Sequence, residues 1–321
     1  MLRCRVMLAL SALAMLLAMG GSGRLRSPGI ALAAERTQNE PSSIEPTSDE
    51  EESSFDDLLS WLKEFRELSQ ALHDDAPEQT RVQQLRQISF LLGDRGLYDE
   101  ADRLLTRAVE SSSADAEHAF SDSLRLAEYR MAAGRNEEAL NIVQRLSIQD
   151  QSREEKIRVA VIQADAGAHF AALGILEDLM PSIPAQAKLL RIRCLWESGA
   201  AEKTLRAIHQ LSLEDLPEPV AQSLVLLRAD CLFTLGRLTE ARDEYERAKR
   251  GERTAERAAW IRFQLGNIAH RQGRLNAARA FYCEAMESWP KTFYASQSEW
   301  FLRTTERIAK ITDRSEVSRG G

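Results

Sequence analysis

The side chains that most often carry chemistry are few in this sequence, and they are not grouped. The five histidines are His73, His118, His169, His209 and His270. There is no H-E-x-x-H or C-x-x-C spacing for a metal, no G-x-S-x-G for a nucleophile and no glycine pattern typical of a phosphate loop. We therefore predict no catalytic residue, no metal ligand and no cofactor, and we expect that the chain is not an enzyme.

The four cysteines do not form a disulfide pattern. Cys4 lies close to the N-terminus, whereas Cys194 and Cys231 each lie five residues before a glycine. Equivalent places on packed helices are about 8–10 Å apart, and a disulfide needs Cα atoms within about 7 Å. We expect Cys194, Cys231 and Cys283 to be free, buried thiols.

The elements that position these side chains are helices. From residue 54 to residue 311 the pattern is helical, with apolar residues at spacings of three and four. The first apolar stripe consists of Phe55, Leu58, Leu59, Leu62, Phe65, Leu68 and Leu72. No comparable stretch alternates with a period of two. We therefore predict an all-α fold without a sheet.

The helical pattern repeats, and each repeat is marked by a glycine. The glycines are Gly96, Gly134, Gly167, Gly199, Gly236 and Gly273, at spacings of 38, 33, 32, 37 and 37 residues. A small residue follows each glycine by five positions: Ala101, Ala139, Ala172, Thr204, Ala241 and Ala278. A bulky one follows by nine: Leu105, Val143, Leu176, Ile208, Tyr245 and Tyr282. The glycine permits a tight turn between antiparallel helices, and the small residue lets them approach closely.

The last repeat, residues 258–290, resembles a tetratricopeptide repeat (TPR). Leu265-Gly266, Gly273, Ala278, Tyr282 and Pro290 stand at the spacing of that family. The resemblance extends over residues 80–290, about two-thirds of the chain. It implies a right-handed α-solenoid of about six TPR-like helix pairs, with terminal helices that cap the stack. Residues 288–308 also resemble the end of periplasmic TPR proteins such as the TolA-binding protein.

The resemblance further implies a concave face lined by the first helix of each pair. The residues that we expect on this protein-binding face are Arg193, Trp196, Asp230, Phe233, Trp260, Phe263, Asn267, His270 and Arg271. Aromatic side chains among scattered charges are typical of a site for a protein or peptide partner. Of these residues, only Asn267 fits the Lys and Asn clamp that grips a C-terminal carboxylate, so we do not expect that mode of binding.

The charge balance excludes a nucleic-acid partner. The chain has a net charge of −7, which becomes −11 without residues 1–33. The acidic excess is strongest at residues 49–57, within a polar segment that has too few apolar residues to fold. The basic residues at 242–257 alternate with acidic ones, which is typical of a solvated helix face.

The N-terminus predicts export. Residues 6–19 form an apolar run of 14 residues after two arginines, which is the length of a signal peptide and is short for a membrane-spanning helix. Cleavage after residue 20 or after residue 33 fits, and we favour the second. Without cleavage the segment would remain as a membrane anchor, the only membrane contact that we expect.

These observations divide the chain into six parts. They are a signal peptide (1–33), a disordered acidic linker (34–53), an N-terminal capping helix (54–79), the repeat array (80–293), a C-terminal capping helix (294–311) and a disordered tail (312–321). We expect a scaffold in the periplasm or cell envelope that binds a protein or peptide through its concave face. The alternative is a structural or self-associating assembly factor without a dedicated peptide groove.

Overall fold

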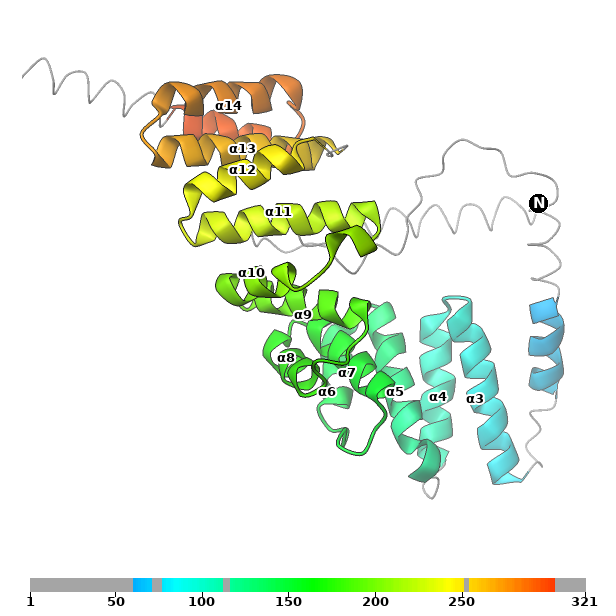
Figure 1. The fold of residues 1–321 in the computed structure, drawn as a ribbon. Coiled ribbons are helices and arrows are strands. Elements are labelled where there is room, and N and C mark those ends of the chain that lie inside the picture. The colour runs from blue at the N-terminus through cyan, green and yellow to red at the C-terminus, as the bar shows by residue number, and fades with distance from the viewer. Residues whose placement is uncertain (1–59, 71–76, 112–115, 251–253, 304–321) are drawn as a thin grey trace, which may run out of the picture. The chain divides into compact units, whose positions relative to one another are not determined.

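The protein is all-α, as the sequence predicts. The computed structural model describes residues 60–70, 77–111, 116–250 and 254–303, and within these ranges it contains helices and no strand. The principal helices are α3 (Glu78–Asp94), α4 (Tyr98–Ser111), α5 (Ala116–Ala132), α6 (Asn136–Val143), α7 (Arg153–Asp165), α8 (His169–Asp178), α9 (Ala185–Glu197), α10 (Ala201–His209), α11 (Glu218–Thr234), α12 (Leu238–Ala248), α13 (Ala255–Arg271) and α14 (Leu275–Ser288) (Figure 1). Further helical segments occupy residues 60–70 and 293–303, and a short 3-10 helix occupies Leu213–Asp215.

Several predicted segments are not part of this description. The signal peptide, the acidic linker and the C-terminal tail lie outside the described residues, as do the first residues of one predicted capping helix and the last residues of the other. None of the described helices combines the length and the apolar composition that are needed to cross a membrane.

The described residues form six helix pairs, and the predicted glycines lie at their turns. All six turn glycines have φ between 73° and 84°. In the second pair the N–H of Gly134 donates to Met131 O at 3.0 Å, and the N–H of Arg135 donates to Arg130 O at 2.7 Å. These two hydrogen bonds together close the C-terminus of a helix around a residue in the left-handed conformation. The second helix of every pair then begins two residues after its glycine.

Backbone conformation explains the glycine at these turns better than lack of space does. A Cβ atom added at Gly134 or at Gly236 would meet no atom within 4 Å. The positive φ values of 78° and 74° are nevertheless costly for a residue with a side chain. The turn signal in the sequence therefore reports a local backbone requirement.

Close packing within each pair follows the predicted spacing. The residues five positions after each glycine are all completely buried. Five of them are alanine, and the sixth is Thr204 in the fourth pair. The Thr204 hydroxyl donates to Ala200 O at 3.0 Å, which allows a polar residue in this tight position. The bulky residues nine positions after the glycine are also buried, and Tyr245 and Tyr282 are the largest of them.

Prolines and one serine define where first helices begin. Pro184 directly precedes α9 and Pro217 directly precedes α11. Ser152 caps α7 through a capping box with Glu155. The hydrogen bonds from the Ser152 side chain and backbone lower the pKa of the Glu155 carboxyl.

The chain divides into two compact units, one with the described residues up to Arg250 and one with residues 254–303. In the first unit five helix pairs stack, because each second helix contacts the first helix of the next pair. The second unit contains α13, α14 and the helix at 293–303. Its core is rich in aromatic residues, including Phe263, Tyr282 and Tyr294.

The helix at 60–70 covers one end of the stack in the first unit. Trp61, Phe65 and Leu68 pack against the core of α3 and α4, and Trp61 Nε1 donates to Leu91 O at 3.2 Å. The sequence pattern places Leu62 in this stripe, but Leu62 is exposed and Trp61 takes the inner position. The indole can pack and also satisfy a carbonyl of α3, which leucine cannot do.

Candidate functional site

Charged side chains join the first helices of neighbouring pairs in the first unit. We call these contacts the ladder: Arg86 with Asp122, Arg125 with Phe90, Arg158 with Glu128, and Arg193 with Asp165. They connect α3 to α5, α5 to α7, and α7 to α9 in turn. The ladder therefore runs along one face, which we call the first-helix face.

The ladder begins with a buried ion pair. Arg86 Nε donates to Asp122 Oδ2 at 2.6 Å, and both side chains are less than 10% exposed. Next to it, the Arg125 guanidinium lies 4.7 Å from the centre of the Phe90 ring. Such a cation–π contact is worth about 0.5–2 kcal/mol, depending on how far it is desolvated.

The next two contacts of the ladder are more exposed. Arg158 donates two hydrogen bonds of 2.7 Å to the two oxygens of Glu128. This carboxylate raises the pKa of the Arg158 guanidinium further above its ordinary value. Arg193 donates to Asp165 Oδ1 at 2.5 Å. Paired in this way, the charged groups fix the spacing of the first helices.

Two of the predicted binding residues lie on this part of the face. Arg193 belongs to the ladder, and Trp196, one turn further along α9, is half-buried. Val161 of α7 stands at the position equivalent to Glu128 and Arg193, six residues before its glycine, and is 38% exposed. Val161 lies one helical turn from Arg158 and from Asp165 on α7, and Trp196 lies one turn after Arg193 on α9, so each of these apolar side chains stands beside a ladder ion pair.

Other predicted binding residues are directed into their own helix pair. Asp230 is only 3% exposed and accepts a hydrogen bond from the hydroxyl of Tyr245. Asn267 stands at the equivalent place in the last pair and accepts from the Tyr282 hydroxyl at 2.8 Å. Phe263 is 7% exposed. Asp230 and Phe263 are therefore buried and Asn267 is half-buried, and protein binding by these three side chains stays a prediction.

The remaining predicted residues are distributed between these environments. Trp260 belongs to the aromatic cluster, with its ring centre 4.7 Å from that of Tyr294. Phe233 and His270 are half-buried on their first helices, and Arg271 is exposed at the end of α13. Protein binding by any of these residues stays a prediction.

The cysteines agree with the expectation of free thiols. Cys194, Cys231 and Cys283 are free thiols. The first two are buried and the third is half-buried. Burial raises the pKa of the Cys194 thiol to about 11 and that of Cys231 to about 12. Both are therefore poor nucleophiles at neutral pH. Across the residues that the structure describes, no cluster of three or more His, Cys, Asp or Glu is arranged to hold a metal ion.

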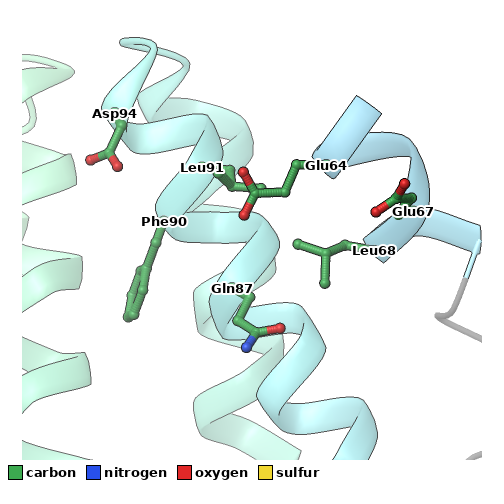
Figure 2. Close-up of a pocket in the computed structure, with 7 residues that line it drawn as sticks. All are labelled: Glu64, Glu67, Leu68, Gln87, Phe90, Leu91 and Asp94. Carbon is green, nitrogen blue, oxygen red and sulfur yellow. The ribbon is translucent and has the colours of Figure 1, made fainter. Parts of the chain in front are cut away.

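A second surface, which sequence reasoning missed, lies between the helix at 60–70 and α3. It is a groove of about 590 Å³ with apolar and acidic lining residues (Figure 2). Its residues come from Glu64, Glu67 and Leu68 on one helix and from Gln87, Phe90, Leu91 and Asp94 on the other. The spacing of three and four residues in each of the two helices could have indicated which residues share one helix face. It could not have indicated that the faces of the two helices meet.

Known proteins support the repeat assignment for part of the chain. A family model described as a tetratricopeptide repeat matches residues 220–291. No curated protein sequence matches.

Three similar solved structures are a tetratricopeptide repeat protein from Parabacteroides merdae, PilF from Pseudomonas aeruginosa, and yeast Tom70. They are 17%, 12% and 12% identical, with TM-scores of 0.47, 0.46 and 0.44. The matches cover 80%, 69% and 81% of this chain and 96%, 98% and 62% of the other chains. The chain is thus an all-α array of TPR-like helix pairs, and its residues 220–291 match the tetratricopeptide repeat family.

Proposed function

We propose that the chain is a non-enzymatic scaffold of the periplasm or cell envelope, which binds a protein or peptide partner through its first-helix face. The repeat fold supports a role in protein interaction. The observation that carries the proposal is that two accessible apolar side chains, Val161 on α7 and Trp196 on α9, each lie one helical turn from the Glu128–Arg158 or Asp165–Arg193 ion pair. Aromatic and apolar anchors beside ordered charges are the composition of a protein interface.

The ion pairs support binding in a second way. Their charges are already satisfied within the chain, so the face does not have to be reorganised when a partner arrives. A partner would contact a surface whose long arginine side chains are held at defined distances from carboxylates. We expect the partner to place an apolar side chain against Trp196.

A capture experiment tests this binding face. Wild type, Trp196→Ala and Phe170→Ala are each used to recover partners from envelope extract. Phe170 is the matched control, because it is an aromatic residue on the second helix α8 and is 77% exposed. We expect Trp196→Ala to lose the partner and Phe170→Ala to retain it, with unchanged helical circular dichroism in both. Equal recovery by all three proteins would contradict the proposed face.

Export is proposed from the N-terminal sequence, and a fusion tests it. Residues 1–40 are joined to a reporter enzyme that folds only outside the cytoplasm. We expect activity from this fusion. Substituting Leu10 and Leu16 with Arg should abolish it, because charges disrupt the apolar run. An inactive wild-type fusion would contradict an envelope location while leaving the binding face untouched.

A second candidate function is self-association in an envelope assembly. The helix at 293–303 carries Trp300 and Phe293, which are 60% and 48% exposed. Exposed aromatic residues at the end of a repeat array can mark an interface. Light scattering on wild type and on Phe293→Ser/Trp300→Ser distinguishes this function, which predicts an oligomer in the wild type only.

A further inference from the structure

The groove between the helix at 60–70 and α3 combines an apolar floor with an acidic rim. Leu68, Phe90 and Leu91 are half-buried and supply the floor, whereas Glu64 and Glu67 are exposed on the rim. Figure 2 shows Glu64 extending over α3 toward Leu91, with Leu68 below it and Asp94 at the far end of the helix.

The floor of the groove is held in place by the core. Leu68 packs against the buried cluster of α3 and α4, and the backbone carbonyl of Leu91 accepts the hydrogen bond from Trp61 Nε1 at 3.2 Å. Arg125 lies against the Phe90 ring and fixes it from α5. A ligand would therefore meet a formed apolar surface.

The lining of the groove carries three carboxylates and no basic side chain. Glu64, Glu67 and Asp94 form no ion pair and no hydrogen bond with any described residue. In the same unit Glu128 and Asp165 are both paired with arginine. The three free carboxylates give the groove a local negative charge that a cationic ligand would complement.

We propose that this groove binds a cationic amphipathic peptide segment of a partner protein. One apolar side chain of the segment would lie on Leu68 and Leu91, and flanking Lys or Arg side chains would reach Glu64, Glu67 and Asp94. A volume of about 590 Å³ is in the range that holds a few side chains, and an amphipathic helix in a groove is a common mode of peptide recognition. The proposal rests on the proposed function, because it requires a protein partner.

The test measures binding of two fluorescent peptides to the full chain by anisotropy. Each peptide has about 14 residues, or about 21 Å of helix, with leucines at spacings of three and four. One carries Lys at its polar positions and the other carries Glu. We expect the Lys peptide to bind, the Glu peptide not to bind, and binding of the first to weaken as salt rises from about 50 mM to about 500 mM.

Charge-neutral variants assign the binding to the groove. The groove variant is Glu64→Gln/Glu67→Gln/Asp94→Asn. The control variant is Glu110→Gln/Glu137→Gln/Asp150→Asn, which changes the net charge equally at exposed carboxylates of other segments. We expect the groove variant to bind the Lys peptide about tenfold more weakly, and the control variant less than about twofold more weakly.

Several outcomes would overturn the proposal. Equal weakening in both variants would show attraction to overall charge, and equal binding of the two peptides would show that the carboxylates play no part. Sedimentation that detects a dimer in the wild type and a monomer in the groove variant would make a second copy the occupant. Failure of the Lys peptide, with continued Trp196-dependent capture of a partner from extract, would overturn only the groove and leave the proposed function standing.

Discussion

The early helix pairs, whose first helices are α3, α5, α7 and α9, use polar side chains differently from the last two pairs. Between α3 and α9, charged groups bridge one first helix to the next. In α11/α12 and α13/α14, a tyrosine of the second helix returns to a polar residue of its own first helix. The Arg–Glu contacts of these late pairs are also internal, as in Arg228 with Glu244 at 2.6 Å.

One backbone repeat therefore supports two kinds of surface. In the early pairs the polar contacts lie on the first-helix face, so they order a surface that a partner can reach. In the late pairs they join the two helices of one pair, so they stabilise the pair and do not connect one first helix to the next. The family match at residues 220–291 falls on the late kind, which indicates that the family pattern describes stability here more than recognition.

The largest effect should come from disturbing the close contact inside a late pair. Ala278 is completely buried between α13 and α14, so Ala278→Arg would overfill the site and bury a charge. We expect a loss of about 4 kcal/mol or more in the free energy of unfolding. Urea denaturation measures it, with Ala280→Arg on the exposed side of α14 as the control. Equal stability of the two variants would contradict the helix register.

The next effect should come from the buried end of the ladder. Asp122→Leu removes the carboxylate that the buried Arg86 contacts, and we expect a loss of about 3 kcal/mol. The double variant Arg86→Met/Asp122→Leu should recover most of this loss, because two apolar side chains replace the ion pair. A double variant as unstable as the single one would show that the pair is needed for reasons beyond its burial.

Removing the tyrosine hydroxyls compares the two late pairs directly. Tyr245→Phe should cost about 2 kcal/mol, because its partner Asp230 is a buried carboxylate, whereas Tyr282→Phe should cost about 1 kcal/mol, because its partner is the amide of Asn267. The free energy of unfolding is again the readout. The reverse order of the two losses would contradict the view that the buried Asp230 carboxyl depends more on its tyrosine than the Asn267 amide does.

The same hydroxyls predict an alkaline limit. Burial, and then the Asp230 carboxylate, raise the pKa of Tyr245, and burial also raises the pKa of Tyr282. A raised pKa of an acid means that folding favours the protonated form. This contribution is complete below the unfolded value of about 10 and is lost as the pH rises above it. We expect the melting temperature to fall above about pH 10 less steeply in the Tyr245→Phe/Tyr282→Phe variant than in wild type.

The smallest effect should come from the exposed part of the ladder. Glu128 and Arg158 are about one-third exposed, so Glu128→Gln should cost only about 0.5 kcal/mol and less at high salt. A double-mutant cycle with Arg158→Gln isolates the pair. A coupling that does not change with salt would contradict an electrostatic contact at the surface.

Much of the fold could be predicted from the sequence because its signals are local. A positive φ requires glycine at turns such as Gly134, and a close helix crossing requires a residue as small as Ala278. Both requirements can therefore be recognised from the residue type alone. The binding face was less predictable. Whether Asp230 is open or covered depends on a tyrosine 15 residues later, and position relative to the glycine does not contain that information.

The N-terminal groove illustrates the same limit. Its two helices come from separate parts of the sequence, and their contact depends on which apolar residue turns inward. The apolar spacing correctly predicts a helix at residues 60–70, but it places Leu62, and not Trp61, on the buried side. Trp61 takes the inner position because its indole packs against the core and also donates a hydrogen bond to Leu91 O. Only the packed structure brings the acidic rim and the apolar floor together.

Site-specific photocrosslinking in the native cell tests whether the protein binds its partner through the first-helix face. A photoreactive amino acid replaces Trp196 on the first-helix face in one strain and Phe170 on the second helix α8 in another. We expect a specific partner to be crosslinked from position 196 and not from position 170. A partner captured equally from both positions, or from position 170 alone, would contradict binding through the first-helix face.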